Sequence, residues 1–191
     1  MSAVVIGLSH RTMPLDLFER FALDASRLPK AVAAMAACDN VTEAAVVSTC
    51  NRTEVYLVAD RFHAAFQEVR DVLCDLSSVD PGDVADHLYV HYDDEAVRHL
   101  LRVAAGVDSD VLGDTEVLGQ VRAAWRTAVG EGTVGPVLDL LFRHALETGK
   151  RARAETGIAR GTASVSHAAV EMAGRHLGSV TGRTVLVLGA G

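Results

Sequence analysis

The stretch AAVVSTCNRTEVYLVA, from Ala44 to Ala59, places two apolar runs on either side of a polar heptad. The runs Ala44 to Val47 and Val55 to Ala59 contain β-branched and aromatic residues, which favour strands. The sequence therefore predicts two neighbouring strands with the heptad Ser48 to Glu54 at their junction. Side chains that carry chemistry are commonly displayed at such junctions.

Short strands and helices alternate on both sides of this stretch. Before it, apolar periodicity predicts a strand over 3–8 and helices over 15–21 and 28–37; after it, a helix over 63–76, a strand over 88–91 and helices that begin near residues 94 and 114. Gly106 is expected to end the helix that begins near residue 94. This pattern predicts an α/β (α+β) fold in which an antiparallel sheet and its helices form a domain over residues 1–140.

The chain has a different character after residue 140. Its sequence is compatible with helix to about residue 177, with breaks expected at Gly149, Gly157 and Gly161. We interpret residues 141–180 as a connector helix region. The apolar run 184–188 then predicts a buried strand that leads into Gly189, Ala190 and Gly191, the start of a further domain over 181–191.

Composition excludes several classes of protein. A net charge of −7 argues against a general polyanion-coating protein, because phosphate neutralisation needs clustered lysines and arginines. The three cysteines form no CxxC pair and are odd in number, which favours a reducing compartment. With no apolar run of about 18 residues and no basic leader, we expect a cytoplasmic protein that does not enter a membrane. We expect no metal site, because the spacing of His87 and His91 lacks the glutamate of a zinc motif.

Cys50 is the candidate nucleophile, because a thiolate attacks carbonyl carbons when its neighbourhood favours the ionised form. In an extended chain, residues two apart share a side, so Arg52 is expected to project toward the same space. Arg52 could then lower the pKa of the thiol, hold a substrate carboxylate, or do both. The alternative is that Cys50 is a small buried hydrophobe.

Several motifs in register resemble one enzyme family. STCNRTEVY at 48–56 is similar to the signature of glutamyl-tRNA reductases, and GLSHRTMPLDLFER at 7–20 is similar to that family's opening motif. The segments 104–109, 111–113, 118–121 and 149–156 follow in the family's order. This resemblance covers nearly the whole chain.

The resemblance implies a reaction. Members of the family reduce the glutamyl group of glutamyl-tRNA to glutamate-1-semialdehyde with NADPH, through a cysteine thioester, as the first step toward 5-aminolevulinate and tetrapyrroles. Cys50 would be the nucleophile, and the hydride would come from NADPH. Gly189, Ala190 and Gly191 resemble the first glycines of a dinucleotide-binding loop. Because that motif stops short of its helix, we expect this chain to bind NADPH poorly.

The resemblance also implies site residues and partners. It implies catalytic roles for Cys50 and His99, and substrate contacts at Thr49, Cys50, Asn51, Arg52, Ser109, Asp114, Thr115, Glu116 and Gln120. The family usually shows a Glu-Pro-Gln-like triplet where this chain has Asp114-Thr115-Glu116, and a carboxylate at Glu116 could pair with the α-ammonium of the glutamyl group. The full-length protein is expected to be a homodimer, with the downstream glutamate-1-semialdehyde aminomutase as a candidate partner.

Three other interpretations stay open from the sequence. The basic side chains of the connector are either a solvated helix face or a surface for tRNA; they are Arg143, Lys150, Arg151, Arg153 and Arg160. The chain could also be a noncatalytic module that binds tRNA or a pathway enzyme. A third alternative, an unrelated Cys-His hydrolase, requires Cys50 and His99 to lie in contact.

Overall fold

A four-stranded antiparallel sheet forms the centre of the molecule. The computed structural model describes residues 2–158 and 165–186. The strands β1 (Ser2–Ser9), β2 (Val41–Ser48), β3 (Arg52–Ala59) and β4 (Tyr89–Tyr92) lie in the order β2-β3-β1-β4. Ser9 pairs with Arg52, and Ser48 pairs with Thr53. The C-terminal end of β1 and the turn between β2 and β3 therefore lie at the same end of the sheet.

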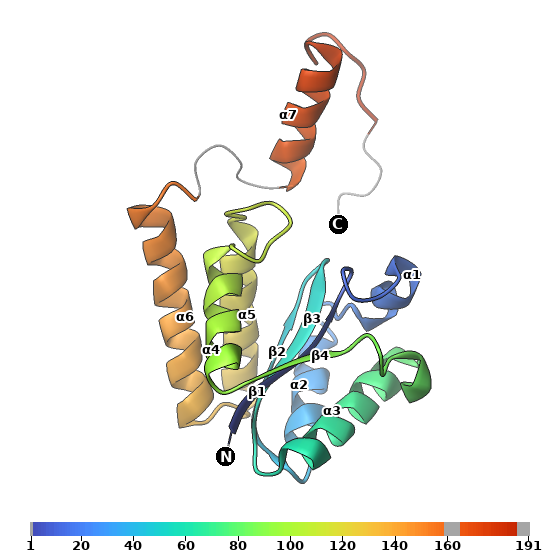
Figure 1. The fold of residues 1–191 in the computed structure, drawn as a ribbon, viewed down its shortest axis with the longest axis vertical. Coiled ribbons are helices and arrows are strands. Elements are labelled where there is room, and N and C mark those ends of the chain that lie inside the picture. Colours follow the sequence, from blue (N-terminus) through green and yellow to red (C-terminus); the bar gives the residue numbers. More distant parts are fainter. Residues whose placement is uncertain (1, 159–164, 187–191) are drawn as a thin grey trace.

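Helices cover both faces of this sheet. On one side lie α4 (Asp94–Ala105), α5 (Glu116–Gly130) and α6 (Pro136–Glu155), and α3 (Phe62–Ser77) lies on the other (Figure 1). The helix α2 (Leu28–Ala36) packs on β2, and the remaining short elements are α1 (Leu15–Phe18), η1 (Glu19–Phe21) and η2 (Pro81–Asp83). Every residue of β3 is buried, as expected for a central strand between two layers. The predicted α/β fold with an antiparallel sheet is confirmed.

The segment that joins α5 to α6 hydrogen-bonds to the backbone of the edge strand β2. The Ala44 amide donates to the Thr133 carbonyl over 2.9 Å, and the Thr133 hydroxyl donates to the Ala44 carbonyl over 2.8 Å. Beside them the buried carboxylate of Glu43 accepts from the amides of Val137 and Leu138, at 3.1 and 2.7 Å. A carboxylate at a helix N-terminus satisfies free amides and complements the helix dipole. Glu43 therefore fixes where α6 begins on the sheet.

The helix α6 belongs to the same core as the sheet. Its buried side chains include Leu138, Phe142 and Ala145, and the ring of Phe142 packs edge-on against Tyr56 of β3. The boundary predicted at residue 140 falls inside this helix. The break predicted at Gly149 is wrong, because α6 continues to Glu155.

Gly149 allows α6 to approach α4 closely. A Cβ at this position would lie 2.5 Å from the carbonyl oxygen of Ala104 and 2.7 Å from a methyl carbon of Leu118. The glycine is therefore explained by packing, and the intrinsic helix-breaking tendency of a single glycine is overridden by the tertiary contact.

Gly149→Ala is expected to destabilise the protein by about 1–3 kcal/mol, because the added methyl group must push α6 away from a backbone carbonyl that cannot rotate aside. Urea unfolding followed by circular dichroism measures this change. Gly130→Ala is the matched control, since a Cβ there meets no atom within 4 Å. Equal destabilisation by the two substitutions would contradict the packing argument.

The segment after α6 contains one more described helix, α7 (Val165–Leu177), drawn in red in Figure 1. Gly161 and the expected dinucleotide-loop residues Gly189, Ala190 and Gly191 lie outside the described residues. Of the strand predicted over 184–188, residues 184–186 are described, and they are not assigned to a strand. None of the helices in the described ranges has the length and apolar character needed to cross a bilayer.

Candidate active site

Cys50 lies at the tip of the tight turn between β2 and β3. The Thr49 amide donates to the Arg52 carbonyl over 2.8 Å, and the Thr49 hydroxyl oxygen accepts from the amides of Asn51 and Arg52, both at 3.1 Å. These bonds leave Cys50 and Asn51 as the two central residues of the turn. Cys50 is exposed, whereas Cys74 is buried. The alternative that Cys50 is a buried hydrophobe is therefore wrong.

A small cavity of about 40 Å³ opens beside this turn. It lies between the turn, the loop that follows α4 and the first turns of α5. Its lining residues are Thr49, Cys50, Asn51, Arg52, Ser109, Asp114, Glu116, Val117 and Gln120. The structure thus brings together the substrate-contacting residues named from the sequence, apart from Thr115, which is exposed and does not line the cavity.

Hydrogen bonds tie the loop after α4 to the tip of the turn. The side-chain amide of Asn51 donates to Asp110 over 2.8 Å, and Arg11 Nη2 donates to the same carboxylate over 2.7 Å. His10 lies 3.3 Å from Asp110 through Nε2 and 3.1 Å from the Asn51 carbonyl through Nδ1. His10 and Arg11, which follow β1, therefore hold the loop after α4 against the turn that carries Cys50.

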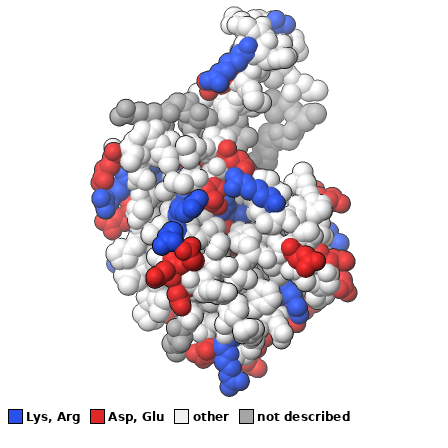
Figure 2. Space-filling view, viewed as in Figure 1, with Lys and Arg blue, Asp and Glu red and all other residues white. Residues whose placement is uncertain are grey.

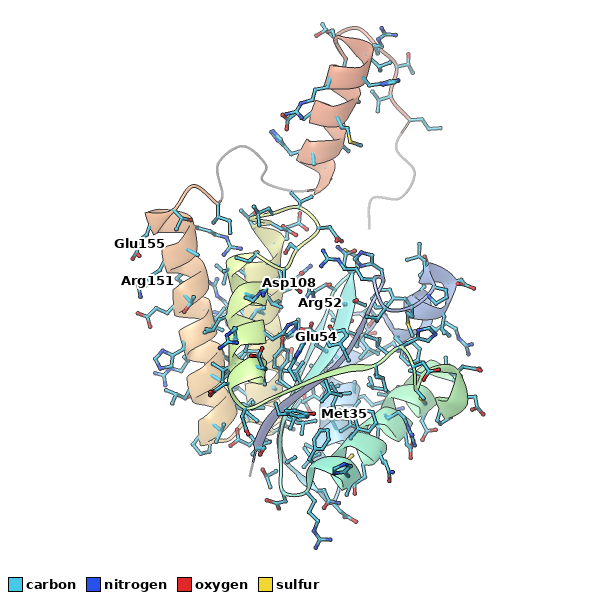
Figure 3. The ribbon with its side chains drawn as sticks, viewed as in Figure 1. Met35, Arg52, Glu54, Asp108, Arg151 and Glu155 are labelled. Carbon is cyan, nitrogen blue, oxygen red and sulfur yellow. The ribbon has the colours of Figure 1, made fainter. Side chains whose placement is uncertain are left out.

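The guanidinium of Arg52 is fully engaged inside the protein. Nη1 lies 3.0 Å from Glu54 Oε1 and 2.8 Å from Asp108 Oδ2, and Nη2 donates to the Asp108 carbonyl over 2.5 Å. Figure 3 shows Arg52 between Asp108 and Glu54. Only 7% of Arg52 is exposed. A substrate carboxylate that bound the same face of this guanidinium would compete with Asp108.

Glu54 organises a buried polar cluster behind the turn. Besides Arg52, its carboxylate accepts hydrogen bonds from the hydroxyls of Tyr56 and Tyr89, both at 2.6 Å, and from Nε2 of His99 at 2.7 Å. Burial alone would raise the pKa of Glu54, but the hydrogen bond from His99 and the charges of His99 and Arg52 lower it to about 2. The same burial and the Glu54 charge raise the pKa of Tyr56 and of Tyr89. Sequence reasoning missed this cluster.

His99 contacts this cluster instead of Cys50. Its ring stacks on His91, with centroids 4.6 Å apart, and burial followed by the nearby His99 lowers the pKa of His91. Within the described ranges, no hydrogen bond joins His99 to Cys50, and the two residues line different cavities. The arrangement therefore gives no support to a Cys-His hydrolase.

The environment of Cys50 differs from the one expected. Burial raises the pKa of its thiol, the carboxylates of Asp114, Glu116 and Asp110 raise it further, and a backbone hydrogen bond partly opposes them. Of the alternatives given for Arg52, lowering of this pKa receives no support, because the net shift is upward and Arg52 is not among its main causes. Cys50 occupies a turn and not an extended strand. The guanidinium of Arg52 bonds to Asp108 and Glu54, although Arg52 and Cys50 both line the small cavity.

Alkylation of Cys50 by iodoacetamide is expected to be slow near pH 7 and to rise steeply toward pH 10, because only the thiolate reacts and its pKa is raised. Asp114→Asn together with Glu116→Gln is expected to speed the reaction at pH 8 by roughly two- to fivefold, because it removes two carboxylates that raise the pKa of the thiol. Mass spectrometry of the Cys50 peptide gives the rate at this residue. An unchanged rate would contradict the assigned role of the two carboxylates.

Arg153 holds the loop between α4 and α5 in place through its backbone carbonyls. This α6 residue donates through Nη1 to the carbonyls of Ala104 and Gly149, both at 2.8 Å, and through Nη2 to the carbonyl of Asp114 at 2.6 Å. It therefore joins the end of α4 to the start of the Asp114 segment.

This inward orientation removes Arg153 from the basic connector face predicted from the sequence. Arg143 pairs with Asp139 at 3.1 Å and Arg151 pairs with Glu155 at 2.9 Å, each on the exposed surface of α6. Arg160 lies outside the described residues. The remaining part of that face is typical of a solvated helix surface with i,i+4 ion pairs.

Among the described residues, no group of three His, Cys, Asp or Glu side chains is arranged so that it could hold a metal ion. The Nδ1 atom of His87 lies 2.6 Å from the Thr12 carbonyl oxygen, whereas His91 stacks on His99. The two histidines thus have separate partners.

The chain is similar to known proteins along its whole length. Residues 6–156 match the family described as "Glutamyl-tRNAGlu reductase, N-terminal domain". Over 191 residues the chain is 47% identical to "Glutamyl-tRNA reductase 1" of a Nocardioides species, and over 192 residues it is 45% identical to "Glutamyl-tRNA reductase" of Salinispora arenicola. These alignments cover 100% of this chain but 44% and 42% of the relatives, so the chain spans less than half of their length.

A solved structure shows the same fold. The glutamyl-tRNA reductase from Methanopyrus kandleri superposes with a TM-score of 0.68 at 35% identity, over 99% of this chain and 43% of the other. The family match ends at residue 156, just after α6, which agrees with the packing of α6 into the core. The chain therefore belongs to the glutamyl-tRNA reductase N-terminal domain family.

Proposed function

We propose that Cys50 accepts the glutamyl group of glutamyl-tRNA as a thioester. The observation that carries this proposal is the exposed thiol at the tip of a rigid turn, beside a cavity lined by the polar side chains of Ser109, Asp114, Glu116 and Gln120. The relatives of this chain are glutamyl-tRNA reductases. A glutamyl group carries one carboxylate and one ammonium, and the charged and polar side chains of the cavity can pair with both.

The proposed step is an acyl transfer. The thiolate of Cys50 attacks the ester carbonyl carbon, the carbon–sulfur bond forms, and the bond from that carbon to the ribose oxygen breaks. The ribose oxygen leaves with a proton as the hydroxyl of free tRNA. NADPH would supply the hydride that converts such a thioester to an aldehyde in a full-length reductase. The residues expected to bind it, Gly189, Ala190 and Gly191, lie outside the described residues, so we assign only the acyl transfer to the part of the chain described.

The carboxylates of Asp114 and Glu116 suit the α-ammonium of the glutamyl group. In the free protein these carboxylates help to raise the pKa of Cys50. An ammonium bound between them would offset their charge and would thereby favour the thiolate. Cys50 would then be activated chiefly when an aminoacyl group is present. The departure from the usual family triplet at Glu116 is compatible with this role.

Arg52 is the proposed partner of the γ-carboxylate. Its Nη1 already holds the carboxylates of Glu54 and Asp108, and its Nη2 donates to the Asp108 backbone carbonyl, so the guanidinium is placed to bind a carboxylate. The cavity of about 40 Å³ has room for only a few water-sized groups. We therefore propose that the glutamyl carboxylate displaces Asp108 from Arg52 and that the cavity widens as this loop withdraws.

His99 is retained as a proposed positioning residue. Its Nε2 bond to Glu54, together with the Arg52–Glu54 pair, links α4 to the turn that carries Cys50. The wider setting is proposed from family membership: tetrapyrrole synthesis, a cytoplasmic homodimer, and contact with glutamate-1-semialdehyde aminomutase.

Transfer of radiolabelled glutamate from charged tRNA to the protein tests the proposal. Label is expected to stay on the precipitated protein and to be released by neutral hydroxylamine, which cleaves thioesters. tRNA charged with glutamine is the matched control, because its neutral amide cannot replace Asp108 on Arg52. Equal labelling from both tRNAs would overturn the role of Arg52, and no labelling from either would indicate a noncatalytic binding module.

A further inference from the structure

The loop between α4 and α5 returns to its own starting point. The Gly113 amide donates to the Gly106 carbonyl over 2.9 Å, so the two ends of the segment 106–114 lie side by side. A Cβ at Gly106 would lie 3.1 Å from the Asp114 carbonyl oxygen, which shows how closely the two ends approach. We call these paired ends, Gly106, Gly113 and Asp114, the neck of the loop.

The loop beyond this neck forms part of both cavities that adjoin the turn between β2 and β3. Ser109 lines the smaller cavity, of about 40 Å³, and Asp108 lines a larger one, of about 360 Å³. Asp108 also pairs with Arg52 at 2.8 Å, and Asp110 accepts from the side chain of Asn51 over 2.8 Å. A shift of this loop therefore changes the space beside the proposed nucleophile.

Arg153 of α6 bonds to the chain on both sides of the neck. Its Nη2 donates to the Asp114 carbonyl at 2.6 Å, and its Nη1 donates to the carbonyl of Ala104, two residues before Gly106, at 2.8 Å. The end of α4, the start of α5 and the end of α6 lie at the same end of this layer of helices (Figure 1). The planar guanidinium presents donors at fixed spacing, so it holds the two carbonyls at a fixed separation.

Stability alone does not explain an arginine at this position. Its hydrogen bonds run to three backbone carbonyls, and its Nε is buried without an acceptor among the described residues. Burial lowers the pKa of Arg153, although the charge of Asp114 opposes this effect. A buried donor without an acceptor destabilises a folded protein. The geometry of the neck is therefore what the guanidinium serves.

We propose that Arg153 is a positioning residue for Cys50, which holds the neck closed so that Asp114 and Glu116 stay beside the thiol while the tip of the loop withdraws. The inference rests on the proposed acyl transfer. Arg153 is not among the described residues that line either cavity, so it acts through the Asp114 segment. The Asp114 side chain accepts from the Glu116 amide over 2.9 Å, and displacement of Asp114 would therefore displace Glu116 as well.

An open neck should have opposite effects on two reactions of Cys50. Burial and the carboxylates of Asp114 and Glu116 raise the pKa of its thiol. When these carboxylates move away and the thiol becomes more exposed, a small alkylating reagent should react faster at a given pH. Acyl transfer should become slower, because the groups proposed to hold the α-ammonium are no longer in place.

Arg153→Lys tests the inference, since lysine keeps the charge but lacks the planar fork. Reaction of Cys50 with iodoacetamide at pH 8 is expected to be faster by about twofold or more, with its pH profile displaced to lower pH. Transfer of labelled glutamate at saturating glutamyl-tRNA is expected to be slower by roughly tenfold or more, the effect of misplaced substrate contacts. Mass spectrometry of the Cys50 peptide measures the first rate, and label on the precipitated protein measures the second.

Arg151→Lys is the matched control, because it makes the same substitution on the exposed face of the same helix. Arg151 pairs with Glu155 at 2.9 Å. Figure 2 shows acidic and basic side chains together over the C-terminal half of α6, at the left of the view, where Figure 3 labels these two residues. Both rates should stay unchanged in this control.

The buried Cys74 reports general opening of the protein in the same alkylation experiment. Faster alkylation of Cys50 with Cys74 still protected supports the inference. Equal acceleration at both cysteines would show a general loss of structure and would overturn it, as would an unchanged rate at Cys50. Labelling that is equally fast in Arg153→Lys and in the unmodified chain would overturn it while the acyl transfer stands. If the unmodified chain is not labelled, the acyl transfer fails, and the alkylation rates alone decide the role of Arg153.

Discussion

Glu54→Gln is expected to lower the free energy of unfolding by about 3–5 kcal/mol at pH 7. The amide keeps the size of the carboxylate but removes the charge that balances Arg52, and it directs two N–H donors toward groups that are themselves donors. Such a change leaves Arg52 buried with Asp108 as its remaining carboxylate partner. Urea unfolding measures the difference. Coincident unfolding curves for the two proteins would contradict the role assigned to Glu54.

The effect of Glu54→Gln should depend on pH in a defined direction. The pKa of Glu54 is lowered from its ordinary value of 4.5 to about 2 in the folded protein. The unfolded chain therefore binds more protons between these values, and the stabilisation by Glu54 is complete above about pH 4.5 and lost as the pH falls toward 2. The difference in the free energy of unfolding between the native protein and Glu54→Gln should therefore decrease as the pH falls over that range. Glu147→Gln, at an exposed position of α6, is the control and should change stability by less than about 0.5 kcal/mol.

Cys50→Ser is expected to reduce transfer of labelled glutamate to the protein by roughly 10³-fold or more, the scale seen when an enzyme loses its nucleophile. A serine hydroxyl needs a base to activate it, and within the described residues His99 is held by Glu54 away from this position. The half-buried Cys38 provides the control, because Cys38→Ser removes a thiol and leaves the cavity unchanged. Label retained on Cys50→Ser would show that another group receives the acyl chain.

Local sequence signals predict the elements that carry the site. The apolar runs around residues 48–54 form β2 and β3, since strand preference and burial favour the same conformation there. Gly106 ends α4 with a φ of 76°, a left-handed conformation that glycine adopts without strain. The residues of the smaller cavity are far apart in sequence, and only the resemblance to a family indicates them together.

The cluster around Glu54 could not be predicted in the same way. A charged residue within a strand usually faces solvent, and Glu54 is buried only because Tyr89 of β4 and His99 of α4 supply donors from distant parts of the chain. The partners of Arg52 could not be predicted either, for a similar reason. One of them is Asp108, in a loop that becomes its neighbour only after folding.

Gly149 and Arg153 belong to a sequence motif whose structural role the sequence does not reveal. Both act where α6 meets α4, the glycine by allowing close approach and the arginine by donating to the backbone carbonyls of Ala104, Gly149 and Asp114. Helix periodicity describes one helix at a time, so it cannot show which positions two helices bring together.

Mass spectrometry of the peptide that contains Cys50, after brief reaction with glutamyl-tRNA and acid quenching, tests the central claim most directly. We predict a glutamyl adduct on Cys50 that neutral hydroxylamine removes, and an unmodified peptide when the tRNA carries glutamine. An adduct on Cys38 or Cys74, or a Cys50 peptide that stays unmodified while tRNA is deacylated, would contradict the account.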